Sequence, residues 1–283
     1  MLSPFVLDRL ARLNLHAADT QRSARLAERA SQPRNPPSAG SRLPAGDEVE
    51  NDLGRHWLVQ APLRQLWPDA DRWLARQRPR VASRHAELTA LADHFPQSVL
   101  YLDLETCGFA GSTVFLIGVL HRDERELLVS QFLARDYAEE PAILRSFWQL
   151  AARNQVLVSF NGKSFDWPMV QDRSVLHRLR DSPSRAWVHC DLLHHARRRW
   201  KACLPNCRLQ TLERFLCGRQ RRGDIPGQDI PQAYHEFVRS GDPRQIRDVL
   251  QHNALDLVTL VQLSVALLSE GDQHVAPSRR AAC

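Results

Sequence analysis

Two acidic residues end an apolar stretch of this 283-residue chain. Residues 99–105 read Val-Leu-Tyr-Leu-Asp-Leu-Glu, a pattern typical of a buried strand that ends in the carboxylates Asp103 and Glu105. Side chains alternate along a strand, so residues i and i+2 point to the same face. Neighbouring acids repel each other, and a divalent ion such as Mg²⁺ or Mn²⁺ would relieve that repulsion by binding their oxygens. The alternative from this fragment alone is a strand end that emerges into solvent.

A third acid follows another predicted strand. Residues 156–160 form an apolar run, and Asp166 comes after a turn that contains Gly162. Functional residues of open α/β sheets gather where strands end, so Asp166 could face the same crevice as the first two acids. Taken alone, Asp166 reads more simply as a helix cap.

The last predicted helix carries a histidine and an acid one turn apart. His252 and Asp256 have i, i+4 spacing, which puts both on one helix face beside apolar residues such as Leu260. Polar groups that pack against a sheet need partners, and a metal ion or its water would serve. Exposure at the beginning of the helix is the other interpretation.

These acids belong to a series of motifs that resembles a known family. The series resembles the motifs of the DEDD 3′-5′ exonuclease superfamily. It consists of Asp-x-Glu on the first predicted strand, Asn-Gly-Lys-Ser-Phe-Asp after the fourth, and an acid four residues beyond a polar residue on the last helix. The closest resemblance is to the YprB-type ribonuclease H-like family, over about residues 95–270. The segments that carry it are 103–108, 115–118, 160–166, 189–193, 204–213, 224–227 and 252–256.

By position, the resemblance implies a two-metal catalytic site. Asp103, Glu105, Asp166 and Asp256 are then the catalytic acids that hold two Mg²⁺ or Mn²⁺ ions. One ion lowers the pKa of water to make hydroxide, and the other stabilises the leaving 3′ oxygen. The expected general base is His252, because an imidazole can take a proton from water at neutral pH. The chain departs from the family at this position. In the family, a base four residues before the last acid is usually tyrosine, and a histidine base usually stands five residues before it. Here the histidine stands four residues before Asp256.

Basic residues concentrate in the second half of the chain. Between residues 178 and 222, twelve arginines and lysines stand against three acids, which predicts a surface for a phosphate backbone. Residues 197–201 could combine phosphate contacts with base stacking on Trp200, or form a solvated helix face. The turn before Asp166 offers either phosphate ligands or structural turn residues. The predicted substrate-binding residues are Asn161, Lys163, Arg197, Arg198, Arg199 and Lys201.

Composition narrows the class of protein. The net charge of +6 and pI near 9.3 permit binding to nucleic acid without requiring it. No apolar stretch approaches the roughly 20 residues of a membrane span. The six cysteines include no Cys-x-x-Cys pair, and no secretory signal with an apolar core is present. We therefore expect a cytoplasmic protein with reduced thiols and no membrane partner.

The chain divides by pattern into four parts. Residues 1–54 contain a Pro-, Ser- and Gly-bearing segment and read as a flexible N-terminal region with a linker. Residues 55–94 read as a helical extension, interrupted by prolines, that packs on the main domain. Residues 95–270 form the main domain, and residues 271–283 a disordered tail.

The main domain has the pattern of an α/β fold. Strands at 99–105, 114–120 and 127–133 precede alternating helices and strands, which predicts a mixed sheet with helices on both faces. The resemblance makes this a ribonuclease H-like sheet of three antiparallel strands followed by parallel ones. It implies a metal-dependent nuclease, a 3′-5′ exonuclease of single-stranded DNA or RNA. The alternative is a ribonuclease H-like module that binds nucleic acid with little or no catalysis.

Overall fold

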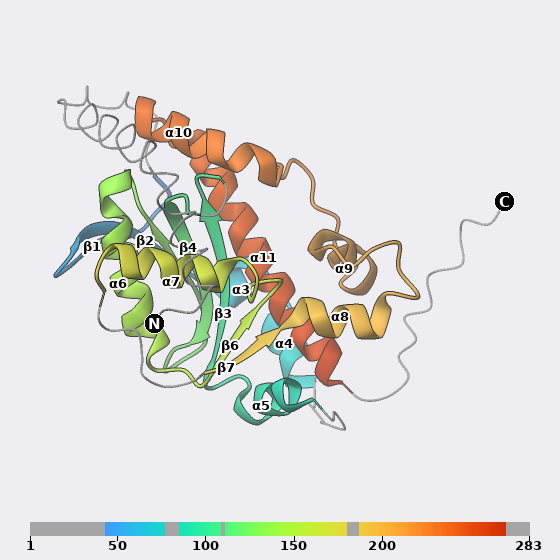
Figure 1. Cartoon of the computed structure of the whole chain (residues 1–283). Helices are drawn as coiled ribbons and strands as arrows, with labels where there is room; N and C mark the ends of the chain where they lie inside the picture. Colours follow the sequence, from blue (N-terminus) through green and yellow to red (C-terminus); the bar gives the residue numbers. More distant parts are fainter. Residues whose placement is uncertain (1–42, 77–84, 109–110, 180–186, 270–283) are drawn as a thin grey trace, which may run out of the picture.

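A mixed sheet of seven strands organises the molecule (Figure 1). The computed structural model describes residues 43–76, 85–108, 111–179 and 187–269. The strands lie in the order β1-β2-β5-β4-β3-β6-β7. Their bounds are Asp47–Asn51 (β1), Gly54–Pro62 (β2), Val99–Thr106 (β3), Val114–Arg122 (β4), Leu127–Leu133 (β5), Val156–Ser159 (β6) and Val188–Asp191 (β7).

The sheet changes from antiparallel to parallel pairing at β3. β4 pairs antiparallel with both β3 and β5, whereas β3 pairs parallel with β6 and β6 parallel with β7. This is the predicted mixed sheet, and the three antiparallel strands fall where the sequence predicted them. β4 is buried from Val114 to His121 and lies at the centre of the strand order, as an uninterrupted apolar strand should.

Helices cover both faces of the sheet (Figure 1). One face packs against α6 and α7, and the long helix α11 crosses the other, with α3, α5 and α8 beside it. The helix bounds are Leu63–Leu66 (α3), Ala70–Arg76 (α4), Ala86–His94 (α5), Glu140–Ala151 (α6), Asp166–Leu176 (α7), Leu192–Trp200 (α8), Leu209–Leu216 (α9), Ile230–Ser240 (α10) and Arg244–Leu268 (α11), and 3₁₀ turns span Tyr137–Glu139 (η1) and Gly227–Asp229 (η2).

A buried carboxylate on α6 connects that helix to β4 and α7. Glu140 begins α6, and its side chain accepts hydrogen bonds from Val114 N (2.8 Å) and the guanidinium of Arg173 on α7. His177 Nε2 lies 2.8 Å from the same carboxylate. Burial alone would raise the pKa of Glu140, but the bonds from His177 and Arg173 outweigh it and hold the pKa below its ordinary value.

The sheet begins earlier in the chain than the sequence predicted. The helical interpretation of residues 55–94 is wrong for β2, and residues 47–51 of the predicted linker form β1. β2 pairs with β5, whose backbone groups would otherwise form an exposed sheet edge. Asn51 then fixes the hairpin to α6 by donating to Ala142 O (2.9 Å) and Ser146 Oγ (3.0 Å). The polar residues taken for a linker are the hairpin turn, where Gly54 has a φ of 129°.

Several predictions concern residues outside the described ranges. The flexible region up to residue 42 and the disordered tail at 271–283 fall there.

The helical interpretation of residues 55–94 is confirmed for α3, α4 and α5. Within the described residues, no helix is both long enough and apolar enough to cross a bilayer.

Candidate active site

Asp103 and Glu105 share one face of β3, as the alternation of strand side chains requires. That face packs against α11. The pairing of β3 with β4 shifts register between Glu105 and Thr106, which is a β-bulge next to the second acid. Bulges re-aim side chains and are common beside active sites.

Asp166 joins the first two acids from the neighbouring strand. β6 ends at Ser159 while β3 continues, so the N–H of Leu104 lies beyond the parallel ladder. Asp166 Oδ1 accepts a hydrogen bond from that N–H at 3.2 Å. Asp166 is thus bonded to the strand residue between the two acids, in addition to beginning α7. The turn before it is tight, because a Cβ on Gly162 would lie 2.3 Å from Ser159 Oγ.

α11 brings His252 and Asp256 to the same place. His252 Nε2 lies 3.6 Å from Asp256 Oδ2, as the i, i+4 spacing predicted. His252 Nδ1 lies 3.0 Å from both oxygens of Asp224, in the loop between α9 and α10. Because a carboxylate only accepts, this closer contact places a proton on Nδ1, and Nε2 is the ring nitrogen that faces Asp256.

Asn253 ties α11 to β3 at the first acid. It is fully buried, and its Nδ2 donates to Asp103 Oδ2 at 2.8 Å and to Asp103 O at 3.2 Å. Its Oδ1 accepts from Gln131 Nε2 on β5 at 2.8 Å. The amide fits only because β4 carries glycine opposite it: a Cβ on Gly118 would lie 1.9 Å from Asn253 Oδ1.

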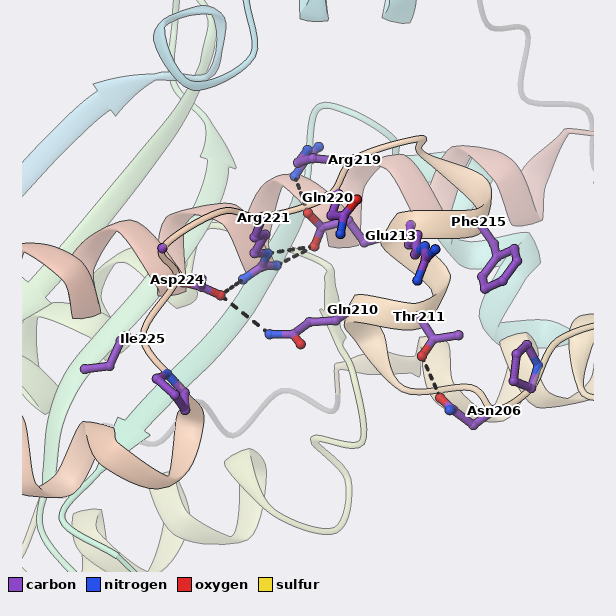
Figure 2. Close-up of a pocket in the computed structure, with 14 residues that line it drawn as sticks. Asn206, Gln210, Thr211, Glu213, Phe215, Arg219, Gln220, Arg221, Asp224 and Ile225 are labelled. Atoms are coloured by element: carbon purple, nitrogen blue, oxygen red, sulfur yellow. Dashed lines mark hydrogen bonds and ion pairs between the residues drawn. The ribbon is translucent and has the colours of Figure 1, made fainter. Parts of the chain in front are cut away.

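Arg221 bonds the fourth acid, and Figure 2 shows its further bonds to Glu213 and Asp224. Its Nη2 donates to Asp256 Oδ1 at 2.5 Å and to Glu213 Oε2 at 2.6 Å, and its Nη1 donates to Asp224 Oδ2 at 3.2 Å. Glu213 is 1% exposed and also accepts from Thr259 Oγ1 at 3.1 Å. Burial would lower the pKa of Arg221, but these carboxylates outweigh burial and raise it. A guanidinium therefore balances part of the acidic charge.

The four acids influence one another's protonation. Burial and the charges of Asp256, Glu105 and Asp166 raise the pKa of Asp103 well above its ordinary value. Burial, Asp256 and Asp166 do the same for Glu105. Burial raises the pKa of Asp166 to about 7, with contributions from Asp191 and Asp256 and opposing bonds from backbone N–H groups. Burial also raises the pKa of Asp256, although Arg221 and His252 oppose it. Like charges from three elements are therefore close enough to interact.

This donor set fits hard divalent cations. All four side chains offer carboxylate oxygens, which Mg²⁺ and Mn²⁺ prefer. Within the described residues, Glu105 accepts no hydrogen bond and forms no ion pair, although neighbouring acids repel its charge. A cation would supply the missing partner.

A second group of possible metal ligands has its ligand atoms closer together than the four acids do, but its side chains are less suited to a metal ion. Among the described residues, Glu87, Cys190 and His195 alone form a trio with potential ligand atoms all within 4.8 Å. Arg198 Nη2 lies 2.6 Å from His195 Nδ1, and a guanidinium only donates, so His195 Nε2 carries the proton that faces Glu87. Lys163 Nζ bonds Glu87 at 2.7 Å, and burial raises the pKa of Cys190 to about 12. These groups form an ion-pair network rather than a set of free ligands.

The predicted substrate-binding residues lie in two places. Asn161 and Lys163 line the turn before Asp166, but their N–H groups donate to Asp191, at 2.8 and 3.2 Å, and Lys163 Nζ is bonded to Glu87. Asp191 also caps α8 by accepting from Leu193 N. The turn residues therefore have structural partners.

The basic run lies at the end of α8. Arg197, Arg198, Arg199 and Lys201 end or follow that helix, and Arg199 bonds the carbonyls of Ala266 and Leu267 near the end of α11. Ala266 is ten residues beyond Asp256, about 15 Å along the helix. Trp200 packs partly buried against the core. The structure does not bring this run to the acids.

Comparison with known proteins identifies the fold and the family. A family profile described as the ribonuclease H superfamily matches residues 100–268. The chain belongs to this superfamily. Over 171 residues it is 36% identical to the uncharacterized protein YprB of Bacillus subtilis, covering 59% of this chain and 41% of that protein. The YprB-type ribonuclease H-like family indicated by the motifs is confirmed.

Two other proteins are similar to part of this ribonuclease H superfamily chain. The uncharacterized protein MJ0365 of Methanocaldococcus jannaschii is 25% identical over 175 residues, which cover 60% of this chain and 95% of that protein. The family B DNA polymerase from Pyrobaculum calidifontis aligns with a TM-score of 0.49 and 20% identity, over 61% of this chain and 25% of the polymerase. The chain spans only about two fifths of the Bacillus relative.

Three functional candidates were not identified from the sequence of this ribonuclease H superfamily member. Gly118 inside an apolar strand was a usable signal, because such a glycine often marks close backbone approach. Asn253 stands between the two residues that were chosen on α11. Arg221 had no local signal for its contact with a catalytic acid, since Glu213 and Asp256 lie 8 and 35 positions away.

Proposed function

We propose that the chain is a metal-dependent 3′-5′ exonuclease that hydrolyses phosphodiester bonds of single-stranded DNA or RNA. Membership of the ribonuclease H superfamily supports a nuclease-type function and nucleic-acid binding. The observation that carries the finer proposal is the convergence of carboxylates from β3, α7 and α11. Asp166 bonds the backbone between Asp103 and Glu105, Asn253 of α11 bonds Asp103, and the charge of Asp256 raises the pKa values of Asp103 and Glu105.

The roles of the side chains follow from their contacts. Asp103, Glu105, Asp166 and Asp256 hold the divalent ions, which activate water and neutralise charge on the phosphate when bound. Asn253 orients Asp103 through its bond to Oδ2. His252 accepts the proton of the attacking water at Nε2, because Asp224 engages its other nitrogen.

The four-residue spacing of His252 is compatible with this role. One helical turn brings its Nε2 to 3.6 Å from an oxygen of Asp256, so the imidazole reaches the acids without a fifth residue.

A nuclease assay tests the proposal. With Mg²⁺ or Mn²⁺, the purified protein should shorten 5′-labelled single-stranded oligonucleotides from the 3′ end and release mononucleotides. Asp103→Ala should lower the rate at least about a hundredfold, since loss of even a hydrogen-bond partner of a metal ligand costs about 10- to 100-fold. Glu124→Ala, in the exposed turn between β4 and β5, is the matched control and should retain full activity. Cleavage that survives Asp103→Ala, or cutting of a closed circular strand, contradicts the exonuclease assignment.

A second candidate function has an observation of its own. Arg221 already engages Asp256 Oδ1 at 2.5 Å, which favours a nucleic-acid-binding module with little catalysis. Salt-sensitive binding of oligonucleotides, with no cleavage under any divalent ion, would support this alternative.

A further inference from the structure

A hollow beside the four acids is lined in part by side chains that have no role in metal binding or proton transfer in the proposed mechanism. It lies between α9 and the loop 219–226, with a volume of about 690 Å³ (Figure 2). That volume is in the range of pockets that hold ligands of nucleotide size, about 300 to 1,000 Å³.

The hollow and the acids share a wall. Arg221 and Asp224 both line the hollow. On their other side, Arg221 bonds Asp256 and Asp224 bonds His252, at 2.5 and 3.0 Å. The hollow is therefore adjacent to the acids, within reach of the nucleotides that precede a 3′ terminal nucleotide held there.

The side of α9 that faces the hollow presents a cation and an aromatic ring. Leu212 and Glu213 are buried, whereas the next two residues of α9, Arg214 and Phe215, are exposed and line the hollow. Phe215 is 38% exposed there, and the guanidinium carbon of Arg214 lies 5.9 Å from its ring centroid. Arg214 forms no ion pair with any described residue, whereas Arg219 and Arg221 are bonded to acidic or polar neighbours.

Amide side chains complete the lining. Gln210 reaches Asp224 only at 3.5 Å, and Gln220 has no bonded partner among the described residues. Amides read the edges of unpaired bases, aromatic rings stack on base faces, and arginines bind phosphates. An acidic peptide would use the arginine but would gain nothing from an aromatic stacking surface.

We propose that this hollow is the subsite for the segment of single-stranded nucleic acid immediately 5′ of the scissile phosphate. Arg214 contacts the backbone and Phe215 stacks on a base. The inference rests on the proposed exonuclease function, because that function defines which end of the strand lies at the acids.

The test separates the subsite from the acids. Binding is measured by fluorescence anisotropy in EDTA with a labelled decanucleotide that carries a 3′ terminal phosphorothioate, in DNA and RNA forms. Arg214→Glu should weaken binding at least about tenfold, and Phe215→Ala about 5- to 150-fold, the range found for loss of one stacking contact. Arg125→Glu in the β4–β5 turn and Val175→Ala, an exposed position on α7, are matched controls and should bind within twofold of wild type.

An abasic oligonucleotide identifies the ligand chemistry. It keeps every phosphate and lacks the bases, so wild type should bind it more weakly than the normal strand, and Phe215→Ala should bind the two equally. Equal binding of both strands by wild type overturns the stacking role. Variants of Arg214 and Phe215 that bind like the controls overturn the subsite.

A small substrate distinguishes failure of the subsite from failure of the proposed function. The p-nitrophenyl ester of thymidine 5′-monophosphate has no upstream nucleotide, so Arg214→Glu and Phe215→Ala should lower the hydrolysis of oligonucleotides with Mn²⁺ more than the hydrolysis of this ester, whereas the controls Arg125→Glu and Val175→Ala should lower neither. Hydrolysis with normal oligonucleotide binding in both variants rejects the subsite alone. Weakened binding in the variants, with no hydrolysis of any substrate by wild type, rejects the exonuclease alone. No binding of oligonucleotides by wild type rejects both.

Discussion

Removing the charge of Glu105 should stabilise the metal-free protein. Its carboxylate is partly buried, faces other acids and has no bonded partner among the described residues. Glu105→Gln keeps nearly the same shape and removes that charge. An uncompensated charge in such a site costs stability, whereas a neutral amide can be satisfied by water at the open side.

Coulomb's law gives the size of the effect. Two like charges about 8 Å apart at an effective dielectric constant of about 20 repel by about 2 kcal/mol. Solvent reduces the sum over several acids, so the expected gain in free energy of unfolding is about 1 to 3 kcal/mol. Glu124→Gln, at an exposed turn, should change stability by less than about 0.5 kcal/mol.

The effect should depend on pH in a defined direction. The pKa of Glu105 is raised in the folded protein, so the folded state binds a proton more tightly than the unfolded state. The penalty is therefore absent below the ordinary carboxyl pKa and grows as pH rises through the raised pKa. The stabilisation by Glu105→Gln should be largest at pH 8 and should vanish near pH 4.

Urea denaturation in EDTA, followed by circular dichroism at pH 4, 6 and 8, measures this difference. Adding Mg²⁺ should then stabilise wild type, by about 2.7 kcal/mol at a hundred times its dissociation constant, and stabilise Glu105→Gln less. A variant that is no more stable than wild type at pH 8, or whose stabilisation is the same at all three pH values, refutes the reasoning.

Three further changes test the supports of the site. Gly118→Ala should destabilise the protein by about 1 to 3 kcal/mol in thermal denaturation, because the new Cβ would lie 1.9 Å from Asn253 Oδ1. This cost should be smaller in an Asn253→Ala background, and additive effects of the two substitutions would contradict that contact. Glu140→Gln should cost about 3 to 5 kcal/mol in urea denaturation because it removes the buried carboxylate that pairs with Arg173. A cost below about 1 kcal/mol would show that the ion pair does not hold α6 to α7. Asp224→Asn should lower the nuclease rate about 10- to 100-fold, because Asp224 orients His252, and an unchanged rate would remove His252 from the proposed mechanism.

Local patterns predicted the elements that carry the acids. The strand alternation at Asp103 and Glu105 and the helical spacing of His252 and Asp256 depend only on residues near in sequence, and both occur as predicted. Asp166 lies beside β3 because parallel strands end at one edge of a sheet. These parts of the site follow from periodicity and strand order.

The hairpin at the start of the sheet was hidden by its composition. Pro62 and the polar residues near Asn51 are typical of linkers and helix boundaries, whereas the alternation in β2 is weak because most of its side chains are half-buried. Its pairing depends on the edge of β5, about 70 residues later in the chain, which no local pattern reports.

Long-range charge pairing was also beyond local reasoning. The run at 197–201 has the higher charge density, yet the arginine that contacts a candidate catalytic acid is Arg221. That contact requires the loop after α9 to fold back on α11, which places Arg221 between Glu213 and Asp256. Charge density predicts a basic surface but not which guanidinium meets which carboxylate.

Manganese binding tests the central claim, that the acids on β3, α7 and α11 form the divalent-ion site. Electron paramagnetic resonance of free Mn²⁺ gives the affinity for wild type, Asp103→Asn and Glu87→Gln. We expect wild type and Glu87→Gln to bind Mn²⁺ equally and Asp103→Asn to bind at least about tenfold more weakly. Undiminished binding by Asp103→Asn, or loss of binding in Glu87→Gln, would contradict the account, because the ion would then lie at the group formed by Glu87, Cys190 and His195.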